Sequence, residues 1–440
     1  MSDVMNQSDQ NQQASVGSTR AKVQASLKKR YSAEKRFQLF GIASVGFGML
    51  CLVILFTDII GKGHGAFLQA EMQLTVNFDS DTLDISDITD EQQLMSANYM
   101  GLLKKTLRKR FPDVSGRKNK KRLYQLISDG AEYQLRDMLK ANPQWLGTTQ
   151  TIWVWADDSV DTVMKGKLGR DIPEAERPLN NMQLDWLDEM TAKGELRKSF
   201  NTNFFSNGAS RNPEEAGIKG AVVGSLLTLM VTLALSFPIG VAAAIYLEEF
   251  APKNKFTDII EVNINNLAAV PSIIFGLLGL AIFLNFFEMP RSAPLVGGLV
   301  LTLMTLPTII ISSRAAIKAV PPSIREAALG IGASKMQMVM HHVLPLAMPG
   351  MLTGTIIGMA QALGETAPLL MIGMVAFIVD IPGGVTDPAT VLPVQIFLWA
   401  DSPERAFVER TSAAIMILVG VLITMNTIAV VLRKRLERRW

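Results

Sequence analysis

The chain has 440 residues, 48% of them apolar, and a mean hydropathy of +0.23. Because soluble proteins seldom average so high and the apolar residues fall in long blocks, the sequence indicates a membrane protein with several spans. The single cysteine, Cys51, excludes an internal disulfide and a cysteine metal cluster, and three histidines argue against a histidine-rich metal site. The net charge is only +3, so the positions of the charges are more informative than their sum.

The N-terminal tail, residues 1–39, is rich in Gln, Ser and Asn and then turns basic, which predicts a partly disordered segment. The apolar run at residues 40–60 is long enough for one transmembrane helix. The long leader and the absence of a small-residue cleavage pattern favour an uncleaved anchor over a signal peptide. Since basic residues flank spans on the cytoplasmic side, the tail is predicted to be cytoplasmic.

Residues 61–216 contain no apolar run of spanning length and are predicted to form a soluble α+β domain outside the cytoplasm. Ten Lys or Arg residues lie between Lys104 and Arg122, either as a solvated helix face or as a patch that attracts anions. Apolar periodicity predicts strands at 66–78 and 149–156 and helices at 91–111, 118–128, 130–141 and 181–193.

From residue 217 the apolar blocks return, and they predict a transmembrane domain that ends at residue 432. Lys and Arg gather in the N-terminal tail, in the loop at 321–345 and in the tail at 433–440, so both termini are predicted to be cytoplasmic. The fold class is therefore an all-α polytopic membrane protein of six spans with an inserted α+β domain. After the first span, the predicted spans are 220–247, 266–287, 295–312, 349–379 and 411–432.

The loop at 321–345 carries a specific pattern, PPSIREAALGIGASKMQMVMHHVLP. Ser323 and Glu326 have the spacing of a capping box, which predicts a helix that begins after Pro322. Gly332 is predicted to loosen the end of this helix and allow a turn. A second helix is then predicted over residues 334–343.

Two small residues and a Leu-Pro pair complete this loop. Ala327 and Ala328 carry little side-chain bulk, so another protein could approach them closely. Leu344 and Pro345 close the segment, and the second helix is predicted to stop before Pro345.

A second motif, Gly-Glu-Thr-Ala-Pro, lies inside the predicted fifth span. A carboxylate such as Glu365 costs about 3 kcal/mol at membrane depth and normally faces a polar cavity or a partner. Pro368, two residues after Thr366, is predicted to bend the helix. Glu365 is therefore a candidate for the translocation path, with an interhelical hydrogen-bond anchor as the alternative. Gln361 has the spacing to bond Glu365 along the helix.

No phosphate-binding loop of the GxxxxGK[ST] type, no nucleophile–base pair and no metal-ligand spacing is evident, so no catalytic, cofactor-binding or metal-binding residue is predicted. The chain is not expected to hydrolyse ATP itself. Nucleic acid is not an expected partner of a basic patch outside the cytoplasm.

Four segments in order resemble the PstA-like family of permeases from bacterial phosphate ABC importers. They are the LEEF helix exit at 247–250, PSIIFG at 271–276, the loop at 321–345, which is similar to the family's EAA loop, and GETAPL at 364–369. The resemblance covers residues 217–440 and leaves out the N-terminal α+β domain. The family often has an arginine where this chain has Gln361, so positive charge for an anion would come from a partner.

The resemblance implies a complex in the inner membrane with a second homologous permease, two ATP-binding subunits and a periplasmic phosphate-binding protein. In such a complex Glu326 would contact the ATPase, Gly332 would permit the turn between the coupling helices, and Glu365 would lie near the pathway. The chain itself would bind no cofactor.

Other functions stay open from the sequence alone. The same EAA-like loop would serve a permease for molybdate or sulfate. A membrane sensor that uses the external domain is an alternative of a different class, although the cytoplasmic segments contain no signalling domain. An ion-coupled transporter with Glu365 as proton carrier gives no reason for the helix–Gly–helix loop.

Overall fold

The computed structural model describes residues 2–86, 88 and 90–436 and divides into two compact units, one up to Gly61 and one from Lys62 onward. The first unit consists of helix α1 (Ser2–Gly63) as far as Gly61, and the part of this helix from Lys29 onward is long and apolar enough to cross a membrane. The polar leader continues this helix, where the sequence predicts partial disorder. It contains no proline before Phe40, so nothing in it breaks a helix.

The second unit begins with an α+β domain, residues 64–216, which is built on an antiparallel sheet of order β2-β1-β3. The strands are β1 (Leu68–Asn77), β2 (Thr149–Trp155) and β3 (Leu196–Phe200). Alternate β1 side chains are buried, as the apolar alternation predicted. The sequence reading missed β3, because only its first residue is buried and the others are polar or exposed.

Helices cover the sheet and enclose its apolar core. The predicted helix at 91–111 is two helices, because Asn98 ends one and caps the next by accepting a hydrogen bond from the Gly101 N–H. The helices of the domain are α2 (Ser80–Leu83), α3 (Glu91–Ser96), α4 (Tyr99–Arg110), α5 (Arg117–Tyr124), α6 (Ala131–Ala141), α7 (Asp158–Met164), α8 (Asn181–Ala192) and α9 (Thr202–Ser206).

The remainder of the chain is helical, and α10, α13 and α16 pack on one another around an apolar core. Including α1, the described residues contain five helices that could cross a membrane, or six if one bent pair is a single span. The helices are α10 (Lys219–Ile245), α11 (Lys255–Ala268), α12 (Ser272–Gly279), α13 (Pro294–Lys318), α14 (Pro322–Gly330), α15 (Lys335–Met338), α16 (Leu344–Gly364), α17 (Ala367–Met371), α18 (Leu392–Ala400) and α19 (Ala406–Leu436).

The predicted span at 266–287 falls in a bent pair of helices, because the chain turns by 100° between α11 and the helix that starts at Ser272. Pro271 causes the bend: it supplies no N–H to continue α11 and disfavours helical backbone at the residue before it. By contrast, α10 runs through Pro238 without a break. Nearby, Gly240 lets α10 approach α13, since a Cβ there would lie 2.7 Å from Ile309 Cγ2.

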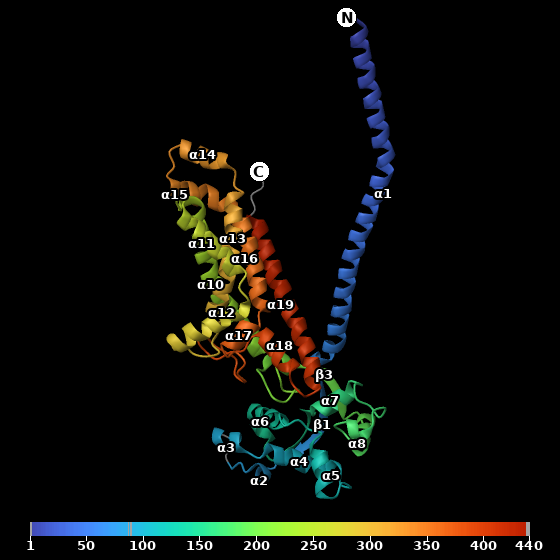
Figure 1. The fold of residues 1–440 in the computed structure, drawn as a ribbon. Helices are drawn as coiled ribbons and strands as arrows, with labels where there is room; N and C mark the ends of the chain where they lie inside the picture. Colours follow the sequence, from blue (N-terminus) through green and yellow to red (C-terminus); the bar gives the residue numbers. More distant parts are fainter. Residues whose placement is uncertain (1, 87, 89, 437–440) are drawn as a thin grey trace. The chain divides into compact units, whose positions relative to one another are not determined.

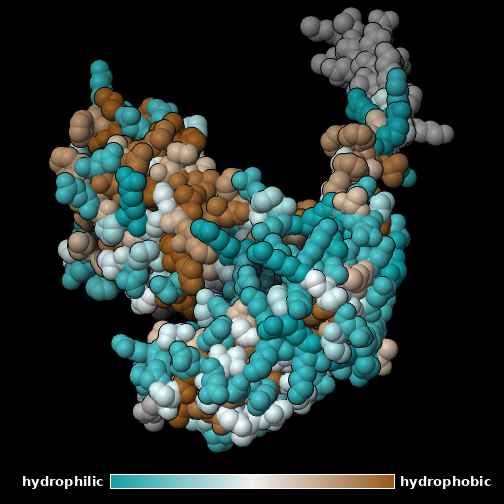
Figure 2. Space-filling model, turned by 90° about the horizontal axis from the view of Figure 1, so that it is seen from below, coloured by the Kyte–Doolittle hydropathy of each residue, from teal (hydrophilic) through white to brown (hydrophobic). Residues whose placement is uncertain are grey.

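The membrane helices of the second unit carry different elements at their two ends (Figure 1). Helices α14 and α15 lie at one end of the membrane helices, here called the coupling end, and the α+β domain lies at the other, the domain end. Seen from the domain end, the surface of the α+β domain is largely hydrophilic, whereas apolar residues gather over the membrane helices (Figure 2). This distribution agrees with a domain in water attached to helices in lipid.

Candidate functional site

The loop at 321–345 forms two helices around a turn, as the sequence predicted, but its caps differ. Helix α14 starts with Pro322 at its first position and has no side-chain cap, so the predicted capping box of Ser323 and Glu326 is wrong. A proline there is already set to helical φ and needs no partner for an N–H. The capping box belongs to α15 instead, where Ser334 and Gln337 bond each other's backbone N–H groups.

Gly332 makes the turn between these helices. Its φ is +89°, a value that side chains other than that of glycine rarely adopt. Its N–H donates to the Leu329 carbonyl at 3.0 Å, and the Ala333 N–H donates to the Ala328 carbonyl at 3.1 Å. A Cβ on Gly332 would meet no atom within 4 Å, so backbone conformation and not space requires the glycine.

The sequence predicted that the second coupling helix stops before Pro345, but in the structure it does not. It continues from Lys335 to Gly364 through a π-helical segment at Val339–Val343. A π segment shifts the backbone hydrogen-bond register by one residue. The missing N–H of Pro345 then falls in the first turn of α16, where it costs least. The loop is therefore joined rigidly to a membrane helix.

The coupling end presents one small residue and several apolar side chains to its surroundings. Ala328 is buried in an apolar cluster with Met338 and Val343, so of the two small residues Ala327 is the one that is open to close approach by another protein. Ala327 and Glu326 are exposed. Beside them lie the exposed apolar side chains of Leu329, Ile331 and Met336, of which Ile331 is 82% exposed.

Ion pairs tie this loop to the LEEF exit of α10, and sequence reasoning missed them. The Arg325 guanidinium donates to Glu249 Oε1 at 2.9 and 3.1 Å and also to the carbonyls of Ile317 and Val320 at the end of α13. Glu249 is 8% exposed. Two adjacent glutamates at the exit of a helix could have indicated ion pairs, but the sequence alone does not show which basic residues they pair with.

A second set of pairs lies next to the first. Arg314 of α13 contacts Glu248 at 3.4 Å and Glu261 of α11 at 2.6 Å, and Lys318 lies 3.5 Å from Glu248. These ion pairs hold the exit of α10 together with helices α11, α13 and α14. A groove of ≈ 890 Å³ runs beside them, lined partly by Pro345 and by the exposed His342.

The predicted fifth span ends at Gly364, so Glu365 and Thr366 lie in a break before the short helix α17. The sequence predicted that Pro368 bends a continuous helix. In the structure Pro368 instead lies in the first turn of a new helix, α17. Gln361 is exposed and Glu365 half-buried, and no hydrogen bond joins their side chains among the described residues. Non-helical backbone at membrane depth is tolerated where it is buried in protein or lines a cavity.

This break packs against the PSIIFG segment. A Cβ on Gly276 would lie 2.6 Å from the Pro368 Cα, so the glycine permits direct backbone contact between α12 and α17. The four motif segments therefore meet in two pairs: LEEF with the EAA-like loop at the coupling end, and PSIIFG with GETAPL at the break in the fifth span.

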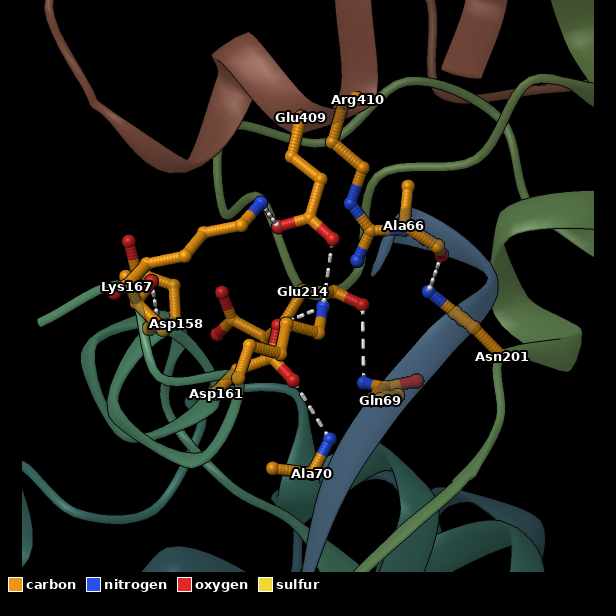
Figure 3. Close-up of polar contacts among 12 residues, drawn as sticks. Ala66, Gln69, Ala70, Asp158, Asp161, Lys167, Asn201, Glu214, Glu409 and Arg410 are labelled. Atoms are coloured by element: carbon orange, nitrogen blue, oxygen red, sulfur yellow. Dashed lines mark hydrogen bonds and ion pairs between the residues drawn. The ribbon is translucent and has the colours of Figure 1, made fainter. Parts of the chain in front are cut away.

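A third polar cluster, at the domain end, was not predicted (Figure 3). It joins Asp161 of α7, Lys167, Glu214 and the start of α19 at Glu409 and Arg410. Glu214 accepts a hydrogen bond from Ser128 Oγ at 2.6 Å, and its backbone carbonyl accepts one from Gln69. The sequence offers little to find this cluster, because its members are remote in the chain; Lys167 and Glu409, for example, are 242 residues apart.

Burial raises the pKa of Glu214 to about 8, which makes chain stability depend on pH. Between pH 4.5 and 8 the folded chain keeps a proton that the unfolded chain loses, so the free energy of unfolding falls as pH rises. We expect the melting temperature of the full chain in detergent to fall from pH 6 to pH 9, and Glu214→Gln to flatten this dependence. Asp157, whose pKa burial raises to about 7, leaves a residual slope of the same sign.

The exposed Glu176→Gln is the matched control and is expected to keep the full pH dependence. An unchanged slope in Glu214→Gln, with both variants folded, would show that Glu214 is not the group that titrates.

Comparisons with known proteins match two parts of the chain. Residues 236–440 match the family model described as "Binding-protein-dependent transport system inner membrane component", and residues 24–174 match "Domain of unknown function (DUF3333)". Among solved structures, a chain of the inward-facing MetNI methionine ABC transporter is similar to this one, with 20% identity and a TM-score of 0.39. The match covers 50% of this chain and 97% of the MetNI chain.

Three curated relatives show the range of similarity. The phosphate transport system permease protein PstA of Yersinia pestis is 30% identical, over 50% of this chain and 72% of the relative. The PstA of Mycobacterium leprae is 30% identical, over 52% of this chain and 74% of the relative. The probable ABC transporter permease protein YqgI of Bacillus subtilis is 33% identical, over 38% of this chain, and the chain spans only 56% of that relative's length.

Proposed function

Because the chain belongs to the family of binding-protein-dependent transport system inner membrane components, we propose that it is the permease component of an ATP-driven importer of inorganic phosphate. Membership of this family makes it a multi-pass inner-membrane permease component and not an enzyme, as the sequence predicted. The observation that carries the proposal is the pairing of the four motif segments in space. Phosphate is further supported by relatives that are named as phosphate permeases.

The surface of the coupling end and the family description, which names a binding protein, support the proposed partners. The exposed apolar side chains of Leu329, Ile331 and Met336, with Ala327 and Glu326 beside them, give the coupling end a surface that suits docking of an ATP-binding protein. Two such ATP-binding subunits and a second homologous permease would complete the transporter, and a periplasmic phosphate-binding protein would deliver the anion. ATP hydrolysis takes place on the separate subunits.

The proposed orientation places both termini and the coupling end in the cytoplasm and the α+β domain in the periplasm. Basic residues at the coupling end, Arg314, Lys318, Arg325 and Lys335, support it through the positive-inside rule. In Figure 1 the coupling end and the α+β domain lie at opposite ends of the membrane helices, as this orientation requires.

Coupling would proceed along the contacts described above. Closure of the ATPases displaces α14 and α15, and the continuous helix from Lys335 to Gly364 carries the displacement to the break at Glu365. The Arg325–Glu249 pair carries it to α10 at the same time. Access would then switch where Glu365, Thr366, Pro368 and Gln361 lie near the pathway. The anion's positive partner would come from the second permease, because these four residues carry none.

The test is uptake of labelled phosphate in cells with and without this chain, with sulfate and molybdate as competitors. We expect loss of high-affinity phosphate uptake without the chain and no effect of either competitor. Uptake that sulfate or molybdate displaces would reassign the permease to that oxyanion. Unchanged uptake of all three anions, with no ATP-binding protein recovered on purification, would favour the sensor.

A further inference from the structure

The α+β domain is attached to α19 through a carboxylate that two of its lysines share. Lys165 Nζ lies 3.1 Å from Glu409 Oε1, and Lys167 Nζ lies 2.8 Å from Oε2. The side chains of Lys165 and Glu409 are 6% and 10% exposed. Lys165 also pairs with Asp161, which accepts a hydrogen bond from the Ala70 N–H of β1 at 2.8 Å. A buried charge network therefore links the sheet to the first turn of a membrane helix.

The surrounding chain is shaped to fit this carboxylate. A Cβ on Gly65 would lie 2.0 Å from Glu409 Oε1, so a larger residue there would displace the Glu409 carboxylate from its lysines. Arg410, 4% exposed, lies over the Phe204 ring at 5.4 Å and is 3.5 Å from the Ala66 carbonyl. Figure 3 shows Glu409 and Arg410 directed into the α+β domain. Such fixed geometry is unlike a surface ion pair, which contributes little and moves freely.

Apolar packing joins the same two parts beside the charges. Phe204 of α9 contacts Trp399 of α18 with 6.3 Å between ring centroids, and Trp399 stacks on Phe407 of α19 at 5.9 Å. Both charge and apolar contacts thus hold the Ala406 end of α19 to the α+β domain.

The other end of α19 contacts the helix that leaves the coupling loop. Helices α16 and α19 pack along each other, and Arg433 donates to Thr353 Oγ1 at 3.2 Å. A displacement that travels along α16 therefore reaches α19 at the end remote from the α+β domain.

We infer that the α+β domain is a brace that holds the Ala406 end of α19 fixed, so that α19 pivots about this end when the coupling loop moves. The family model that matches residues 24–174 assigns that region no function, and this inference supplies one. It rests on the proposed function, because ATP-driven motion of the coupling loop is its source of movement. Breaking the Glu409 pairs would leave buried charge without its partner, which is energetically costly. The pairs are therefore expected to stay formed throughout the ATPase cycle.

The test measures two distances in the full chain, assembled with its partner subunits, on a Cys51→Ser background. Spin labels are placed at Lys118→Cys and Arg405→Cys in one sample and at Lys118→Cys and Val431→Cys in the other. Lys118 and Arg405 are exposed, and Val431, 47% exposed, is near the coupling end of α19. Electron–electron resonance is recorded without nucleotide and with ATP trapped.

The brace predicts that the Lys118–Val431 distance shifts by more than about 2 Å with ATP while the Lys118–Arg405 distance stays within about 1 Å. Shifts in both distances would overturn the brace and leave the transporter function intact. No nucleotide effect on the Lys118–Val431 distance would also overturn the brace, since it would show that ATP does not move this helix, and the uptake assay would still decide the transporter function.

Variants at Glu409, Lys165 and Lys167 test whether these charges hold the brace. In Glu409→Gln, the Lys118–Arg405 distribution is expected to broaden and to become sensitive to ATP. Lys165→Met is expected to do the same, and Lys167→Gln to do so less, because Lys167 is 40% exposed. If Glu409→Gln fails to assemble, the two distances in the chain with Glu409 intact still decide the question. A Glu409→Gln complex with an unchanged, narrow Lys118–Arg405 distribution would show that these charges do not hold the brace.

Discussion

A Gly332→Pro variant is expected to insert into the membrane and accumulate normally but to lose phosphate uptake by at least about tenfold. Proline requires φ near −65°, whereas the turn holds Gly332 at +89°. Proline also removes the N–H that donates to Leu329. The local cost is about 3 kcal/mol or more, enough to displace α14 from α15. ATP hydrolysis by the assembled complex should persist without transport, which parallel assays of uptake and ATPase activity would measure.

The matched control is Gly330→Ala, two residues earlier in the same loop. Gly330 ends α14 without a positive φ, and a Cβ there would meet nothing within 4 Å. This variant should keep uptake within about twofold, since alanine favours helix over glycine by roughly 1 kcal/mol. Normal uptake in Gly332→Pro would show that the turn does not couple ATP hydrolysis to transport.

Loss of the Arg325–Glu249 pair is the second large expected effect. Arg325→Ala removes four hydrogen bonds, two to Glu249 and two to the last carbonyls of α13, and leaves a nearly buried carboxylate unpaired. Hydrogen bonds to charged groups contribute about 1.5–3 kcal/mol each when buried, and less here because Arg325 is 21% exposed. We expect uptake to fall by at least about tenfold while ATPase activity becomes insensitive to the binding protein.

Two further variants separate this pair from a general effect of charge. Glu249→Gln should reproduce the defect, because the amide cannot hold the guanidinium by charge. Lys318→Gln should change uptake by less than about twofold, since Lys318 is 58% exposed and 3.5 Å from Glu248, and exposed pairs contribute about 0–1 kcal/mol. Equal uptake in Arg325→Ala and Lys318→Gln would show that transport does not need the ionic link between α14 and the exit of α10.

Several elements of the fold were predictable because their signals are local. Apolar blocks of spanning length identified the membrane helices, and period-two alternation identified β1 and β2. The turn at Gly332 was predictable because glycine is the usual residue for positive φ. The family resemblance was equally local, since each of its four segments is a short run of sequence.

The errors arose where local rules compete. Ser323 and Glu326 have capping-box spacing, but Pro322 already starts the helix, so the true capping box lies at Ser334. The effect of each proline depends on its context: α10 continues through Pro238, a π segment accommodates Pro345, and Pro271 bends the chain by 100°. Sequence shows that a donor is missing but not which neighbouring groups compensate for it.

The sequence by itself determined which segments enter the membrane, where the coupling turn lies and which family the permease half resembles, because hydropathy, backbone conformation and motif order are properties of short segments. Only the tertiary structure decided that Arg325 pairs with Glu249, that Gly276 contacts Pro368, and that Lys165 and Lys167 share Glu409. These contacts join residues that are remote in the chain, and the sequence of a charged residue's neighbours does not show which residue it pairs with. Burial of the carboxylate partner, which makes such pairs costly to break, exists only in the folded chain.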